Sequence, residues 1–101
     1  MGIQKDAGEM LVLIHKYYIE KNSGIKDKQF MEITGWDMDR LRRAMVYLHE
    51  KRFIYLIQNI DGGFFVIKPY PDGIDIVENE GMFETTFGIN LGVVNVSWKK
   101  K

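Results

Sequence analysis

The sequence predicts a small α+β domain in which three helices precede a β-hairpin and a further short helix follows it. Two observations lead to this prediction. Apolar residues recur at helical spacing in the first half of the chain, and after position 53 they give way to runs rich in aromatic and β-branched residues. An Asp-Gly-Gly tract separates two such runs, which is a strong short-range signal for a hairpin turn.

The first helix is expected over roughly residues 4–22. Its apolar side chains recur three and four positions apart, so they form a single stripe that can face a core. Asn22, Ser23 and Gly24 follow and are typical of a helix stop. The apolar stripe consists of Ala7, Met10, Leu11, Ile14, Tyr17 and Tyr18.

A short second helix is expected after an extended residue, Ile25. Asp27 is placed to cap this helix, and Phe30 and Ile33, three positions apart, can face the core together. Gly35 then breaks the helix, because a glycine can adopt the positive φ that a tight turn requires.

The third helix is expected over residues 38–52. Asp37 is a good N-cap for it, since a carboxylate can accept a hydrogen bond from an N–H group of the first turn. Its buried face is expected to consist of Leu41, Ala44, Met45, Leu48 and Arg52. The other side carries Asp39, Arg42, Arg43 and Val46, with Arg40 and Tyr47 on its flank.

Two strands are expected over residues 54–59 and 64–68, where aromatic and β-branched side chains suit a pleated surface. The tract Ile60-Asp61-Gly62-Gly63 between them is expected to form the hairpin turn. Pro69 and Pro71 end the second strand, because neither proline can donate a hydrogen bond to a ladder.

A short helix from about Asp72 is expected to close the domain, which then spans residues 1–80. Residues 81–101 are expected to form a C-terminal extension with a β-strand at 89–98, in which a change of phase at Gly92-Val93 indicates a bulge or a bend. An apolar strand of this kind cannot stay a free edge. It either packs back on the domain's own sheet and first helix or pairs with a second copy, which predicts a homodimer.

This order of elements resembles the winged helix-turn-helix superfamily, in which a three-helix core carries a β-hairpin wing. In many small prokaryotic and archaeal members a short closing helix follows. The resemblance covers roughly residues 7–80 and is most specific at 33–37 and at 51–54. In that family the residue before the helix cap plugs the turn, and Trp36 stands at this position. The family often has a glycine just after the recognition helix, whereas this chain has Arg52.

The resemblance implies a DNA-binding protein, in particular a small transcriptional regulator whose helix 38–52 enters the major groove of double-stranded DNA. In that placement Arg40 and Arg43 could make bidentate contacts with guanine, and Arg42 could reach a phosphate group. Tyr47 could touch the sugar-phosphate backbone. The full set of candidate DNA contacts is Arg40, Arg42, Arg43, Tyr47, Asp39 and Lys68.

Other features favour a different interpretation. The chain carries 14 basic and 14 acidic residues, whereas nucleic-acid binding draws on net or local positive charge. Asp39 places a negative charge where the helix would approach DNA, or pairs with Arg43 one turn later. The hairpin turn has no Lys or Arg to enter a minor groove. The alternative function is therefore a winged-helix protein–protein interaction module that does not bind DNA directly.

No enzyme is expected, because the sequence contains no nucleophile elbow, phosphate-binding loop or dinucleotide-binding fingerprint. His15 and His49 are the only histidines and cysteine is absent, so neither a metal site nor a disulfide is expected, and no cofactor is implied. No apolar run approaches the roughly 18 to 20 residues needed to span a bilayer. A cytoplasmic protein is the default expectation.

Overall fold

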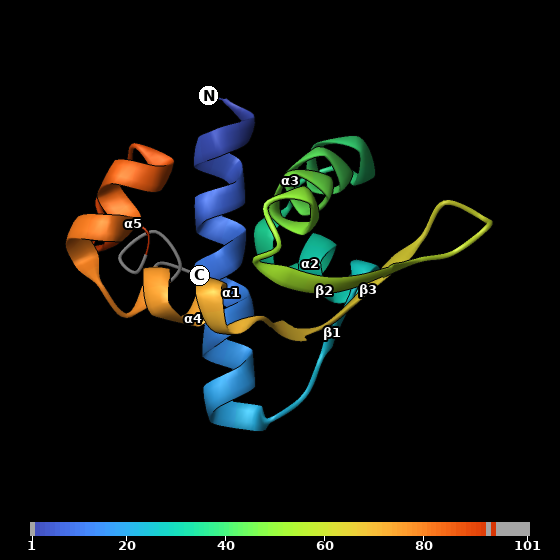
Figure 1. Ribbon diagram of the computed structural model, residues 1–101. Helices are drawn as coiled ribbons and strands as arrows, with labels where there is room; N and C mark the ends of the chain where they lie inside the picture. Colours follow the sequence, from blue (N-terminus) through green and yellow to red (C-terminus); the bar gives the residue numbers. More distant parts are fainter. Residues whose placement is uncertain (1, 93, 95–101) are drawn as a thin grey trace.

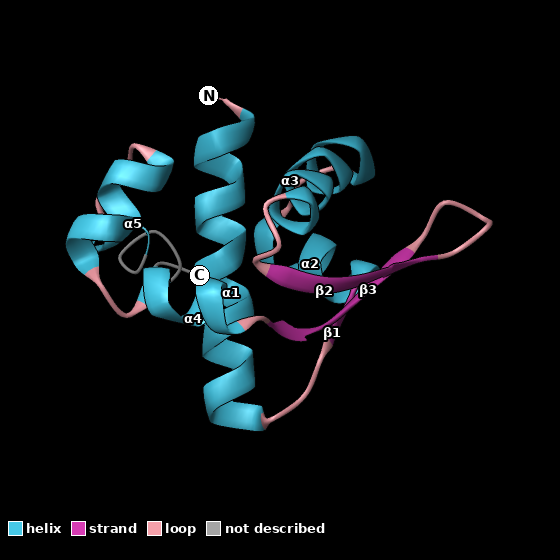
Figure 2. Ribbon diagram, viewed as in Figure 1, coloured by secondary structure: helices cyan, strands magenta, loops and turns pink. Residues whose placement is uncertain are grey.

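A long first helix, α1 (Ile3–Lys21), runs through the middle of the molecule, and the other elements pack around it (Figure 1). The computed structural model describes residues 2–92 and 94. Within them it contains five helices and a three-stranded antiparallel sheet, which confirms the predicted α+β class (Figure 2). The second and third helices and the sheet lie on one side of α1, and the last two helices lie on the other (Figure 1).

The bounds of α1 agree closely with the predicted helix, and Asn22 ends it with a left-handed φ of 50°. Its burial differs from the prediction. Residues 10–14 are buried at every position, so this part of α1 is covered on all sides and does not present a single stripe. A helix that is apolar all round is expected inside a protein, between two layers. The central position of α1 is the reason for the difference.

The second helix, α2 (Asp27–Thr34), begins as predicted, but Asp27 is its first residue and not its cap. Lys26 occupies the cap position, and its backbone N–H donates to the side chain of Gln29 at 3.0 Å. The Asp27 carboxylate accepts hydrogen bonds from the backbone N–H of Lys28 at 2.7 Å and of Phe64 at 3.2 Å. Asp27 therefore joins α2 to the hairpin.

The third helix, α3 (Met38–Glu50), ends two residues before its predicted end. Asp37 caps it as predicted, since its carboxylate accepts a hydrogen bond from the backbone N–H of Arg40 at 2.8 Å. Arg52 was expected on the buried face, but it is exposed and lies beyond the helix with a φ of 64°. Arg52 therefore adopts the left-handed backbone conformation that glycine usually adopts just after a helix. The fully buried face consists of Leu41, Ala44, Met45 and Leu48.

The sheet has the strand order β1-β3-β2, and both strand pairs are antiparallel. Its strands are β1 (Ile25–Lys26), β2 (Ile54–Gln58) and β3 (Phe64–Pro69). The extended residue expected before α2 is thus part of a short strand that pairs with β3. Ile25, Leu56 and Val66 are buried and point from the sheet into the core. The register shifts between Tyr55 and Leu56, where β3 contains one extra residue.

Two helices follow the hairpin, α4 (Pro71–Val77) and α5 (Glu80–Phe87). A helix near the position of α4 was predicted, whereas α5 was not. Asn79 caps α5, because its side-chain oxygen accepts a hydrogen bond from the backbone N–H of Met82 at 3.0 Å. Phe83 and Phe87 are fully buried, and α5 packs against α1. Residues 80–87 therefore belong to the same core as the residues before them.

The predicted C-terminal strand at 89–98 is not present in its described part. Residues 89–92 and 94 form no strand, and residues 91, 92 and 94 are helical. Val94 is buried, and Ile89 and Leu91 pack against the core, so this part of the chain lies back on its own domain. Residues 93 and 95–98 lie outside the described residues. Pairing of such a strand across a dimer therefore has no support in the part of the extension that is described.

Candidate nucleic-acid interface

The turn before α3 is held by the side chain of Thr34. Its hydroxyl donates to the carbonyl oxygen of Phe30 at 2.7 Å and accepts a hydrogen bond from the backbone N–H of Trp36 at 3.1 Å. Gly35 adopts a φ of 75° between them, in the left-handed region that a Cβ atom disfavours. Trp36, which follows the turn, is partly buried and packs against the hydrophobic core.

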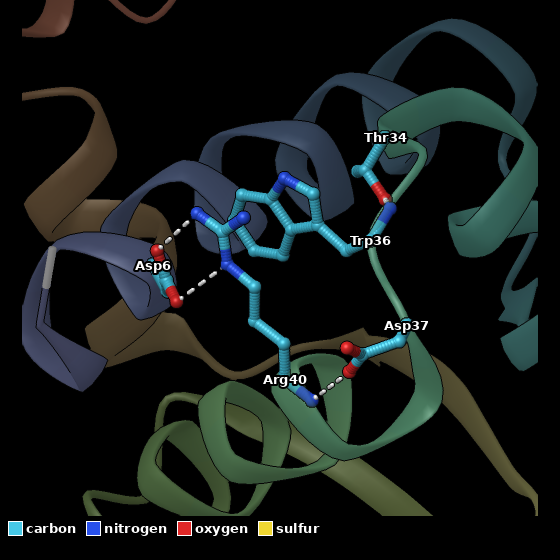
Figure 3. A network of polar contacts seen from close by, with 5 residues as sticks. All are labelled: Asp6, Thr34, Trp36, Asp37 and Arg40. Carbon is cyan, nitrogen blue, oxygen red and sulfur yellow. Dashed lines mark hydrogen bonds and ion pairs between the residues drawn. The ribbon is translucent and has the colours of Figure 1, made fainter.

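Arg40 fills the space between the Trp36 ring and α1 (Figure 3). Its guanidinium donates from Nε to one carboxylate oxygen of Asp6 and from Nη2 to the other, both at 2.9 Å. The Cζ atom of Arg40 lies 3.7 Å from the centre of the Trp36 ring, a cation–π distance. The side chains of Arg40 and Asp6 are 28% and 12% exposed. The first predicted base contact is therefore held by an intramolecular pair that connects α3 to α1.

Two pKa shifts accompany this network. The hydrogen bonds from Arg40 to Asp6 raise the pKa of the Arg40 guanidinium, which keeps it charged. Burial raises the pKa of Glu9, and the charge of Asp6 raises it further, while the charge of Arg40 acts in the opposite direction. Glu9 therefore stands beside the ion pair as a half-buried acid that is easier to protonate than usual.

Arg42 connects α3 to the hairpin tip, which we define as residues 59–63. Its Nη2 donates a hydrogen bond to the backbone carbonyl oxygen of Gly62. Its Nη1 lies 3.4 Å from the carboxylate of Asp39, and these two side chains are 37% and 78% exposed. The guanidinium thus has two partners, of which one is an exposed ion pair of small energetic value. The hydrogen bond to Gly62 places the outer side of α3 and the hairpin tip next to each other.

The outer side of α3 carries a shallow hollow that we call the α3 face. It is lined by Ile3, Arg42, Arg43, Val46, Tyr47 and Glu50. Arg43 is exposed and pairs with no acidic side chain among the described residues. Tyr47 is half-buried, and the ammonium group of Lys51 lies 5.7 Å from its ring centre. The α3 face therefore combines an apolar lining with two arginines and one acidic residue, Glu50.

Lys68 is exposed but lies at the other end of the hairpin, opposite Tyr55 in the strand register. It lies five positions from Gly63, the last residue of the hairpin tip, which corresponds to roughly 17 Å along a strand. Near it the rings of Tyr55 and Tyr70 stack, with centres 5.8 Å apart. The fold does not bring Lys68 to the α3 face.

The structure thus gathers four of the six predicted contacts around one face. Arg42, Arg43 and Tyr47 line this face, and Asp39 lies beside it through its pair with Arg42. Arg40 turns towards α1, and Lys68 is distant. Sequence reasoning missed Ile3, whose place beside α3 depends on how two helices pack. It also gave no role to Ile60, although a large apolar residue inside a hairpin turn was a visible signal.

Two further observations concern metal binding and membrane insertion. No group of three or more His, Asp or Glu side chains within residues 2–92 and 94 is arranged to hold a metal ion. His15 pairs instead with Glu78 at 3.0 Å. None of the helices in the described part of the chain has the length and apolar character required to cross a bilayer.

Comparisons of this chain with protein-family models, with curated proteins and with solved structures each found no match.

Proposed function

We propose that this protein is a winged helix-turn-helix protein that binds double-stranded DNA through α3, as a small transcriptional regulator does. The order of elements supports the fold assignment. Three helices pack together, a short strand between the first two pairs with the hairpin, and the hairpin stands beside the third helix. In this arrangement the third helix is the one that enters the major groove.

One observation carries the proposal. Arg43 is exposed on α3 without an acidic partner among the described residues, and Arg42 beside it holds the hairpin tip through Gly62. The hydrogen bond from Arg42 to Gly62 therefore places a cationic edge of α3 beside the hairpin tip. Figure 1 shows this hairpin projecting from the molecule on the side where α3 lies. A duplex that meets this face engages both elements at once.

Under this proposal the three arginines of α3 have different roles. Arg43 is the residue for a bidentate contact with guanine, because its guanidinium is free to turn towards base edges. Arg42 is the phosphate contact, and Tyr47 borders the sugar-phosphate backbone. Arg40 is a positioning residue, since its ion pair with Asp6 fixes the angle between α3 and α1.

The experiment is a salt titration of binding to a fluorescent duplex of mixed sequence, followed by anisotropy. Affinity is expected to fall steeply between about 50 and 200 mM salt, because each phosphate that the protein neutralises releases counterions. The double variant Arg42→Ala/Arg43→Ala is expected to bind more weakly, and its logarithmic salt slope should decrease by about 1 for each phosphate that it no longer neutralises.

The matched control is Lys16→Ala/Lys21→Ala, which removes two exposed positive charges from α1, away from the α3 face. It lowers net charge by the same amount and should leave the binding curve nearly unchanged. Absence of binding at low salt would overturn the proposal. Equal weakening in the two double variants would also overturn it, since binding would then follow net charge and not this face.

A protein-docking module is the second candidate, and a specific observation favours it. Ile57 and Ile60 are 42% and 108% exposed on the hairpin, where a phosphate backbone offers them no apolar partner. Docking through these side chains would depend weakly on salt, so the same titration distinguishes the two functions.

A further inference from the structure

The hairpin tip presents an apolar side chain next to an acidic one. Ile60 is fully exposed, and Asp61, which follows it, is also exposed. The turn that carries them is closed by hydrogen bonds, from the backbone N–H of Asn59 to the carbonyl of Gly63 at 2.8 Å and from that of Gly62 to the carbonyl of Asn59 at 3.1 Å. The tip is therefore a hydrogen-bonded turn that projects an apolar side chain, Ile60, next to a negative charge, Asp61.

The α3 face has the complementary character. Its apolar lining is formed by Ile3, Val46 and Tyr47. Its charged lining consists of two arginines, Arg42 and Arg43, and one acid, Glu50, so positive charge is in excess. Arg43 has no acidic partner in the described part of the chain. A segment with an apolar side chain followed by a carboxylate would complement this surface. The apolar side chain would pack on the apolar lining, and the carboxylate would pair with Arg43. The tip offers Ile60 and Asp61 in this sequence.

A chain does not place its own tip in its own hollow, because Ile60 is fully exposed in the folded chain. The two surfaces are nevertheless neighbours, since Arg42 lines the hollow and also holds Gly62 of the tip. Two surfaces that are complementary and adjacent on one chain can each meet the other on a second chain across a two-fold axis. An interface of this kind is closed and contains each contact twice.

We propose that the α3 face is an interface between two copies of this chain, in which the tip of each copy docks on the hollow of the other. Ile60 of one copy packs on Val46 and Tyr47 of the second, and Asp61 pairs with Arg43. This inference goes beyond DNA binding and does not require it. The dimer covers the same face that a duplex would use.

The test is an exchange of charges measured by sedimentation velocity at low ionic strength, where exposed pairs act most strongly. The variant Asp61→Arg opposes Arg43 of its partner with a second arginine, and Arg43→Asp opposes Asp61 with a second acid. Each variant alone is expected to sediment as a monomer. An equal mixture is expected to form a dimer, because complementary Asp–Arg pairs are then restored between the two different chains.

An apolar substitution provides the second measurement. Ile60→Ser is expected to weaken self-association at least tenfold. Ile19→Ser is the matched control, because Ile19 is 60% exposed on α1 and lies roughly 24 Å along the helix axis from Ile3. It should associate as the unaltered chain does. Circular dichroism and thermal melting of every variant establish that each one is folded.

Three results would overturn the proposal. The first is an unaltered chain that stays monomeric at about 1 mM, the concentration at which even a weak dimer forms. The second is a dimer that persists in both charge variants, which would place the interface elsewhere. The third is a mixture of the two variants that fails to associate. Each of these outcomes is independent of whether the protein binds DNA.

Discussion

Arg40 illustrates how a charged residue on the outer part of a helix can serve the fold. Its guanidinium lies over the Trp36 ring and donates two hydrogen bonds to Asp6, so these two donors, Nε and Nη2, are directed at α1. If Asp6 or Arg40 were removed, the other would be a partly buried charge without its counterion. The free-energy cost of that unpaired charge is larger than the stability that the intact pair contributes. The network thus fixes α3 against α1, and Arg42 and Arg43 are the cations that remain for a ligand.

Glu9 adds a pH dependence to this network. Its pKa in the folded chain is raised above the ordinary value of 4.5, first by burial and then by Asp6. The folded state therefore holds the proton more tightly than the unfolded state does. In consequence the contribution of Glu9 to the free energy of unfolding is most favourable below the unfolded pKa and declines as pH rises through the raised folded pKa.

The variant Glu9→Gln cannot ionise and should escape this decline. We expect it to be more stable than the unaltered chain at pH 7, with a difference that shrinks towards about pH 4, where Glu9 is itself largely protonated. Urea denaturation of both proteins at the two pH values measures the difference. A difference of the same size at both values would show that the effect comes from packing and not from the charge of Glu9.

At the scale of elements, the sequence predicted the helices, turns and strands that are specified by residues close to one another in the chain. The bounds of α1, the turn at Gly35, the cap at Asp37 and the two long strands follow from spacing, glycine and capping chemistry, and the structure has them within two residues. The helix α5 was not predicted, because two threonines and a glycine lower the helix propensity of this segment. Phe83 and Phe87 nevertheless stand at helical spacing.

The candidate site could be predicted only in part, because some of its contacts join residues that are far apart in the chain. Helical periodicity places Arg42 and Arg43 on the outer side of α3, and the structure has them there. The pairing of Arg40 with Asp6 spans 34 positions, and the hydrogen bond of Arg42 to Gly62 spans 20. Contacts of this kind are decided by how helices and strands pack, and no local pattern encodes them.

The packing of α5 on α1 depends on a glycine. A Cβ atom added at Gly8 would lie 2.7 Å from the Cβ atom of Phe87, closer than side chains tolerate. Alanine is normally favoured over glycine inside a helix by about 1 kcal/mol. At this position the helical gain is opposed by overpacking of α5 against α1, which typically costs about 1 to 3 kcal/mol.

We therefore expect Gly8→Ala to destabilise the protein by up to about 2 kcal/mol. Gly81→Ala is the control, because this glycine is exposed in α5 and its added Cβ atom would meet nothing nearer than 3.5 Å. That variant should gain stability. Chemical denaturation compares the two substitutions directly, and an equal gain in both would mean that α5 does not pack on α1 through Gly8.

For the whole molecule, neutrality is a less informative property than the distribution of charge. Basic and acidic residues number 14 each, but the partly buried pair of Arg40 with Asp6 removes one cation and one anion from the balance near α3, and Asp39 offsets Arg42 only through an exposed ion pair. From position 43 to the turn after α3, the chain then carries Arg43, Lys51 and Arg52 against Glu50. A local positive charge therefore persists on a neutral chain, and it borders the apolar lining of the α3 face.

A face of this composition can meet a duplex or a second copy, but not both at once. If both proposals hold, a duplex of about one and a half helical turns, too short for two chains side by side, should convert dimers into complexes of one chain per duplex. Sedimentation velocity with a labelled duplex measures this stoichiometry at protein concentrations above and below the dimer dissociation constant. The Ile60→Ser variant, whose dimer is weaker, should keep this one-to-one complex up to higher protein concentrations than the unaltered chain does. A complex that keeps two chains on one duplex would show that dimer and duplex use different surfaces, and the site of self-association would then have to lie away from α3.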